Sequence, residues 1–279
     1  MRPRHRFLSA GLIVACATLT MAGGTHAPVD QPAAVGAGAP DGPGVFDGPT
    51  VRVGDGTAHS FVTLDAAGNP TEVGMRLSEG AMDGLPATHD DVATFELDLP
   101  DEAAATVFDH TTLDWNDHGH GPSGMFDKPH FDTHFYMADK AAVAEIDPAS
   151  PDFEAKGLRL PDPRYLPPDY FPMLGPKLVP QASPAMGVHW FDVADGVIPG
   201  PYQFTLAFLN GTWDGDYTFM EPMVTREWML TKPNTVRSIK QPQAYQRSGY
   251  YPTTVAVTFD DTADEYVITM GGMVLCQAS

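Results

Sequence analysis

Four of the ten histidines fall within the seventeen residues from His118 to His134. His118 and His120 form a His-x-His pattern, and His130 and His134 form a His-x-x-x-His pattern. Because successive side chains of an extended chain point to opposite faces, His118 and His120 share a face. By the same alternation, His130, Asp132 and His134 share a face of the second segment. Neutral imidazole is a ligand for Zn, Cu, Fe and Ni, so the spacing predicts a divalent metal site, with Zn as the first candidate.

The stretch between the two histidine pairs, Gly121-Pro122-Ser123-Gly124, has the composition of a turn. A reversal there would bring the two pairs together. The opposite face of the second segment carries Phe131, Thr133 and Phe135, which predicts that this face belongs to the core. A structural interpretation stays open, in which the imidazoles donate to backbone carbonyls or pair with the neighbouring carboxylates Asp117, Asp127 and Asp132.

Two residues farther along the chain are also candidates. His189 lies beside Trp190, where a lone histidine more often packs than ligates. Glu221 interrupts an apolar strand, where an unpaired charge is costly, so it needs a partner such as a metal ion or Arg226. The predicted metal ligands are therefore His118, His120, His130, His134 and His189. Glu221 and Asp132 are the predicted catalytic residues, each able to act as a general base.

Known catalytic signatures of other kinds are missing. The sequence has no Gly-x-Ser-x-Gly motif, no phosphate-binding Gly-x-x-x-x-Gly-Lys-Ser/Thr loop and no His-Glu-x-x-His motif. The histidine cluster is therefore the strongest chemical signal in the chain.

The elements that must position these residues are short alternating strands. Most alternating segments end in Gly, Asp, Asn or Pro, which is typical of antiparallel hairpins. We predict strands over residues 50–53, 60–64, 71–77, 93–99, 203–209, 217–223, 255–259 and 266–270. Helical composition is confined to residues 78–85, 102–108 and 140–146. The fold class predicted is mainly β, an antiparallel single domain, sandwich or barrel-like, with a few short helices.

A long proline-rich loop is predicted from residue 147 to residue 187. Eight prolines between residues 161 and 184 interfere with regular ladders. Its apolar side chains nevertheless need burial, so we expect the segment to be ordered against the domain without strand pairing. These side chains are Tyr165, Leu166, Tyr170, Phe171, Met173 and Leu174.

The N-terminal residues predict export. Arg2, Arg4 and Arg6 precede an uncharged apolar stretch over residues 7–21, which is the layout of a signal peptide. Cleavage after Ala27 would release a soluble protein, whereas lipidation of Cys16 would tether it to a membrane. We expect simple export, which makes the domains 1–27 signal peptide, 28–46 disordered spacer and 47–279 β-rich domain.

Charge and cysteine content limit the partners. The formal net charge of −20 makes nucleic acid an unlikely partner, because phosphate binding needs a concentrated basic patch. After ordinary cleavage only Cys276 remains, so neither a disulfide within the chain nor a cysteine metal site is expected. The expected partner is a metal ion or a small molecule, and a membrane only if Cys16 is lipidated.

Several stretches around these residues resemble an uncharacterised bacterial domain family typified by a sigma-E-regulated protein of an extreme thermophile. They are Asp114-Trp115-Asn116, His118-Gly119-His120, Pro129-His130-Phe131-Asp132, His134-Phe135-Tyr136, Gly187-Val188-His189-Trp190 and Phe219-Met220-Glu221-Pro222-Met223. The resemblance extends from about residue 51 to residue 275. It implies a β-rich domain that assembles as a homo-oligomer and has a histidine-lined pocket including His189 and Glu221. It supplies no reaction.

Three functions fit these observations. The first is a metal-dependent hydrolase or lyase of the cell envelope, in which three histidines hold an ion with an open position. The second is a non-catalytic protein that sequesters a metal or small ligand during envelope stress. The third is a structural oligomer whose histidines only tie strands together. An open three-ligand site favours the first, and a closed site favours the other two.

Overall fold

Two antiparallel sheets make up most of the computed structural model, which describes residues 43–88, 92–175, 177–195 and 203–279. The seven-stranded sheet has the order β1-β3-β4-β16-β15-β13, and β2 pairs with β3. Its strands are β1 (Gly44–Asp47), β2 (Val51–Val53), β3 (Gly56–Leu64), β4 (Pro70–Ser78), β13 (Asn234–Ser238), β15 (Thr254–Asp260) and β16 (Glu265–Gly271).

The eight-stranded sheet has the order β5-β6-β7-β12-β11-β10-β8, and β9 pairs with β10. Its strands are β5 (Ala93–Leu97), β6 (His110–Asn116), β7 (His130–Tyr136), β8 (Tyr170–Pro172), β9 (Ala182–Ser183), β10 (Gly187–Asp192), β11 (Leu206–Trp213) and β12 (Asp216–Thr225). A third pair consists of β14 (Gly249–Tyr251) and β17 (Val274–Cys276). The mainly β, antiparallel fold predicted from alternation is therefore confirmed.

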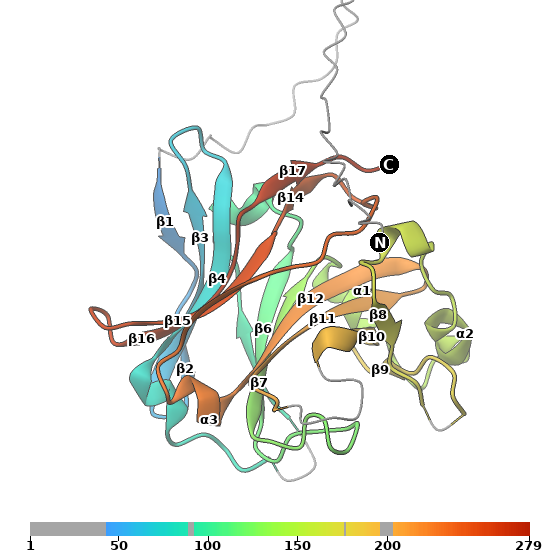
Figure 1. The fold of residues 1–279 in the computed structure, drawn as a ribbon, viewed down its shortest axis with the longest axis horizontal. Helices are drawn as coiled ribbons and strands as arrows, with labels where there is room; N and C mark the ends of the chain where they lie inside the picture. Colours follow the sequence, from blue (N-terminus) through green and yellow to red (C-terminus); the bar gives the residue numbers. More distant parts are fainter. Residues whose placement is uncertain (1–42, 89–91, 176, 196–202) are drawn as a thin grey trace, which may run out of the picture. The chain divides into compact units, whose positions relative to one another are not determined.

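The main core lies between the two large sheets. It joins Val73, Met75 and Ile268 of the first sheet to Phe131 and Phe135 of the second, all fully buried. In Figure 1 the blue and cyan strands β1, β3 and β4 lie on one side of this core, and the green and orange strands β6, β7, β11 and β12 lie on the other. Because side chains alternate along each strand, the remaining residues of β7 must face away from this core.

Helices are few and short. They are α1 (Lys140–Ala144), α2 (Phe153–Gly157) and α3 (Arg226–Met229), beside 3-10 turns at Glu79–Met82, Asp101–Ala105, Pro163–Tyr165 and Val193–Asp195. Of the three predicted helical segments, only the one containing α1 is an α-helix. Its N-cap Asp139 accepts a hydrogen bond from the Ala142 N–H, whereas the turns at Glu79 and Asp101 have no side-chain cap. No helix of the described residues is long and apolar enough to cross a membrane.

The proline-rich segment differs from the prediction in two ways. Residues of β8 and β9 do pair with β10, so the segment contributes two short ladders to the edge of the sheet. Tyr170 is buried as expected, but Phe171 and Leu174 are about half exposed. The alternation of β8 explains this difference for Phe171, because a strand that buries Tyr170 turns its neighbour to the other face.

The boundaries of two further predictions also change. The hairpin turn between β11 and β12 is only Asp214-Gly215, both with positive φ, so the two strands run closer to each other along the chain than the predicted strands 203–209 and 217–223. The last residues of the predicted spacer, 44–46, belong to β1, which pairs with β3. The predicted leader, Cys16 and the rest of the spacer lie outside the described residues.

A partly buried ion pair links the outer strand of the first sheet to the 3-10 turn that follows β10. Both guanidinium nitrogens of Arg237 on β13 contact the carboxylate of Asp195, at 2.6 and 3.0 Å. The Phe208 N–H of β11 donates to the same carboxylate at 3.0 Å. Asp195 is only 9% exposed, so the carboxylate depends on these partners for compensation.

We expect Arg237→Ala to lower the free energy of unfolding by about 1–3 kcal/mol, because it leaves a buried carboxylate without its cation. Chemical denaturation with urea measures this. Arg159→Ala is the matched control, since Arg159 pairs with Asp214 at an exposed position and its loss should cost less than about 1 kcal/mol. Equal effects of the two substitutions would contradict the assignment.

Candidate metal centre

Polar and ionisable side chains occupy the face of the eight-stranded sheet that points away from the main core. The register between β6 and β7 places Asp114 opposite Asp132 and Asn116 opposite His130. On the other side of β7, Met220 pairs with Phe135 and Met223 with Asp132, which sets Glu221 beside His134. His189 arrives on the same face from β10, two strands farther on, because it pairs with Gly211 of β11.

Apolar side chains cover this face. Phe204 packs on His130 with ring centroids 5.1 Å apart, and Phe126 lies 5.8 Å from His120. Phe219 and Tyr136 contact His134, at 4.8 and 5.4 Å. The ionisable groups are thus enclosed between the sheet and the segments that cross it.

The first group that could hold a metal ion consists of His120, His130 and Asp132, whose ligand atoms all lie within 4.8 Å of one another. His130 Nε2 is 2.9 Å from Asp132 Oδ1, but the two atoms do not meet in hydrogen-bond geometry. His120 Nε2 lies 3.2 Å from the other oxygen, Oδ2. Two imidazole nitrogens and one carboxylate are thus close enough to bind the same ion.

The second group consists of His134, His189 and Glu221, again with ligand atoms within 4.8 Å of one another. His134 Nε2 is 3.5 Å from Glu221 Oε1, and His189 Nε2 is 3.6 Å from Oε2. All three side chains come from paired strands of the sheet, and none is more than 8% exposed. Each group therefore offers two imidazoles and one carboxylate, a donor set that suits zinc and other transition metals.

Neighbouring oxygen atoms fix the orientation of three of these imidazoles. His130 Nδ1 donates to the Lys128 carbonyl at 2.6 Å, and His120 Nδ1 donates to the Gly121 carbonyl at 2.8 Å. His134 Nδ1 donates to Asp114 Oδ2 at 2.8 Å. Because the acceptors hold a hydrogen on Nδ1, each Nε2 points at a carboxylate, and loss of the Nε2 proton would leave its lone pair free for an ion. Metal-binding histidines have this second hydrogen bond almost always.

Buried polar atoms without a partner concentrate on this face. In the described part of the chain, seven buried side-chain N or O atoms have no hydrogen bond, and six of them belong to residues of this face. They are Asp114 Oδ1, His130 Nε2, Asp132 Oδ1, His134 Nε2, His189 Nδ1 and Glu221 Oε2. Such atoms cost free energy unless something compensates them, so their concentration on one face indicates a ligand that these residues share.

The pKa values follow from burial and from the mutual fields of these groups. Burial raises the pKa of Glu221 to about 8, although His134 opposes the shift. Burial would lower the pKa of His134, but Glu221 and the hydrogen bond to Asp114 outweigh it and raise that pKa to about 9. Burial would also lower the pKa of His120, but the hydrogen bond and the charge of Asp132 outweigh this effect and raise that pKa to about 9. Burial, with repulsion from His134, lowers the pKa of His189 to about 3.

His118 does not join the other histidines. Its side chain is 69% exposed, and its Nδ1 lies 2.7 Å from Asp117 Oδ1. The prediction that all four clustered histidines converge fails here, because β6 ends at Asn116 and His118 lies in the following loop, with no strand alternation to direct it. His120, from the same loop, does reach the face.

The sequence analysis missed Asp114 and Asn116 as site residues. Asp114 orients His134, and Asn116 Nδ2 donates to Asp132 Oδ2 at 2.8 Å. A signal was present, since the two residues alternate along one strand. Only the register with β7 shows that they share its histidine face.

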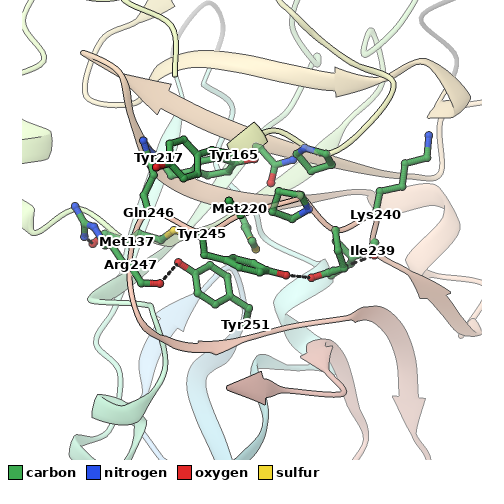
Figure 2. Close-up of a pocket in the computed structure, with 15 residues that line it drawn as sticks. Met137, Tyr165, Tyr217, Met220, Ile239, Lys240, Tyr245, Gln246, Arg247 and Tyr251 are labelled. Atoms are coloured by element: carbon green, nitrogen blue, oxygen red, sulfur yellow. Dashed lines mark hydrogen bonds between the residues drawn. The ribbon is translucent and has the colours of Figure 1, made fainter. Parts of the chain in front are cut away.

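A separate cavity is lined in part by residues of the main core and is not part of this centre. Figure 2 shows Tyr217, Tyr245, Tyr251 and Met220 around it, and its lining contains no histidine and no carboxylate. It has room for about one water molecule, about 20 Å³. A second, more open groove beside α2 also contains no residue of the two candidate groups.

Comparison with known families gives one match. Residues 65–115 match a family described as TTHB210-like, hypothetical protein TTHB210. This supports similarity to an uncharacterised domain family over a minor part of the chain. The matched stretch includes Asp114 but ends before the first histidine of the two groups. No curated protein and no solved structure matches the chain.

We predict that Asp114→Asn lowers metal affinity by about 10–100-fold, because the carboxylate orients His134 and increases its basicity. Isothermal titration with Zn²⁺ measures the change. Asp109→Asn is the matched control, since Asp109 contacts Nδ1 of His110, a histidine of the same strand outside both groups. An affinity unchanged by Asp114→Asn would show that Asp114 has no part in orienting a ligand.

We also predict that metal affinity rises with pH and levels off above about pH 9. A coordinating imidazole must be neutral, and the pKa of about 9 at His134 and His120 means that both carry protons below that pH without metal. Affinity should fall roughly tenfold per pH unit for each proton that the ion displaces. Titration with Zn²⁺ between pH 6 and pH 9 tests this, and a flat profile would argue against histidine ligation.

Proposed function

We propose that this chain is an exported protein that binds divalent metal ions on the buried face of its eight-stranded sheet. The observation that carries the proposal is the concentration of unpartnered, buried imidazole nitrogens and carboxylate oxygens on that face. Hydrogen bonding alone leaves these atoms unsatisfied, whereas metal ions would compensate those that belong to the two groups.

The types of ligand atom in the two groups limit the choice of metal ion. Imidazole nitrogen with carboxylate oxygen suits Zn²⁺, Fe²⁺, Co²⁺, Ni²⁺ and Cu²⁺, whereas Ca²⁺ and Mg²⁺ prefer oxygen ligands throughout. Zn²⁺ is the first candidate, because it accepts two histidines and one carboxylate without a preference imposed by d electrons.

Binding is better supported than turnover. Five of the six side chains in the two groups are less than 9% exposed, and the cavities described above include none of them. A substrate must reach an open coordination position, so a closed face favours retention of the ion. The resemblance to a family typified by a sigma-E-regulated protein supports metal sequestration during envelope stress as the setting.

Export rests on the sequence of the first residues. The three arginines followed by an uncharged apolar stretch support secretion, with a lipid anchor at Cys16 as the other route. The strongly acidic composition fits an extracytoplasmic protein that must stay soluble.

A metal-dependent hydrolase or lyase is the second candidate. One observation favours it, namely that three protein ligands per group leave coordination positions free for water or a substrate. Metal-activated water could then attack an ester or phosphoester. Release of nitrophenol from chromogenic esters by the zinc-loaded protein, lost in Asp132→Asn, would favour this candidate over binding alone.

The proposal predicts that the purified chain carries at least one transition-metal ion and that chelator destabilises it. An ion present at a hundredfold excess over its Kd adds about 2.7 kcal/mol to folding stability. For a domain of this size that corresponds to a melting temperature higher by about 5–10 °C. Elemental analysis by mass spectrometry and thermal melting with and without chelator measure both effects.

The variants Glu221→Gln and His134→Asn should lower the chelator-sensitive part of the stability, because both residues belong to one of the two groups. His118→Asn is the matched control and should retain it, because His118 is exposed and lies outside both groups. The proposal would be contradicted if the wild-type protein contained no metal and its melting temperature did not change with chelator or added Zn²⁺. The buried histidines and carboxylates would then form a structural polar network only.

A further inference from the structure

The two candidate groups differ in how their ligands are held. His134, His189 and Glu221 lie on β7, β10 and β12, and all three strands are paired on both sides. Ladder hydrogen bonds therefore hold the backbone of each ligand on both sides. We call this set the inner group.

The other set, His120, His130 and Asp132, has one ligand that is not on a strand. His120 lies in the loop between β6 and β7, and its side chain is 36% exposed, whereas His130 is fully buried and Asp132 is 7% exposed. We call this set the outer group. Its single accessible ligand distinguishes it from the inner group.

The loop between β6 and β7 is built to place His120. The His120 N–H donates to the Phe126 carbonyl at 3.1 Å, which folds the loop back on itself. Gly119 has a positive φ of 74°, and a Cβ there would lie 2.1 Å from the Phe126 carbonyl oxygen. Only glycine permits this close approach, so the position of His120 depends on it.

The same loop also orients both imidazoles of the outer group. The Gly121 carbonyl accepts from His120 Nδ1, and the Lys128 carbonyl accepts from His130 Nδ1. Asp132 is fixed independently by Asn116 of β6. Opening of the loop would therefore withdraw one ligand and release another from its orienting partner, while the carboxylate stays in place.

We propose that this face binds two metal ions that exchange at different rates. A retained ion is held by the inner group, and a second, exchangeable ion is held by His120, His130 and Asp132. The exchangeable ion leaves when the loop carries His120 away, because two remaining protein ligands bind it weakly. This inference rests on the proposed metal-binding function and adds the number of ions and the route of exchange.

The two buried, unpartnered atoms of the outer group support a second ion. His130 Nε2 and Asp132 Oδ1 lie 2.9 Å apart without a hydrogen bond, and the inner group does not include either of them. An ion at the inner group alone would leave both atoms without a hydrogen bond. The charges agree, since the face carries the carboxylates Asp114, Asp132 and Glu221, and no lysine or arginine is buried in the described part of the chain.

The test uses the full chain freed of metal, reloaded with Zn²⁺ and passed over a desalting column. Elemental analysis counts the bound ions, and a chromogenic zinc chelator follows their release. The expected result for the wild type is two ions per chain, released in a fast and a slow phase of equal amplitude. His120→Ala should lose one ion and the fast phase while keeping the slow phase.

His118→Ala is the matched control, because it changes a histidine of the same loop that lies outside both groups. It should retain both phases. His189→Asn should lose the slow phase, and circular dichroism establishes that each variant is folded. Gly119→Ala should behave as His120→Ala does, since it displaces the loop without removing a ligand.

The alternatives give distinct results. One slowly released ion in the wild type that His120→Ala leaves unchanged would overturn the second site and leave the proposed function standing. One ion lost in both His120→Ala and His189→Asn would show a single shared site and overturn the inference too. No bound ion in the wild type would overturn the proposed function itself.

Discussion

The face of the eight-stranded sheet that points away from the main core is governed by the burial of charge. Asp114, Asp132 and Glu221 are almost inaccessible to water, and four histidines surround them. A carboxylate in such a place must be neutralised by a proton, a cation or a set of donors. Without metal, burial raises the pKa of Glu221 and the neighbouring carboxylates raise the pKa of His134, which favours neutralisation by protons. The protons on these groups occupy the positions where an ion would bind.

One strand connects this constraint to the fold. Alternate residues of β7 face the apolar core and the polar face, so Phe131 and Phe135 hold the sandwich together while His130, Asp132 and His134 face the other way. A shift of one residue in the register would exchange the two faces and bury the charged set in the core. The apolar packing therefore also fixes the positions of the candidate ligands. The two functions of the strand cannot be separated.

The alternation of residues was enough to predict part of this structure from the sequence. It identified the core face of β7, the shared face of its histidines and the hairpin of β15 and β16. It could not predict that β6 ends at Asn116, because strand ends depend on the loop that follows, and here His118 points to solvent. It also could not place Asp114 next to His134. That contact comes from the register between two strands, which a single sequence does not specify.

His189 and Glu221 show a second limit of prediction from the sequence. Each was a candidate for reasons of local composition, but the strands that bring them to His134 are separated from it by the whole proline-rich segment. Because these strands lie far apart in the sequence, binding of an ion between them would affect the stability of the fold. An ion at the inner group would join β7, β10 and β12, and the unfolded chain has no such site, so its binding free energy would add to folding stability. Within the described residues the single cysteine is Cys276, and no disulfide joins these strands. A metal ion would thus supply a cross-link between strands that lie far apart in the sequence.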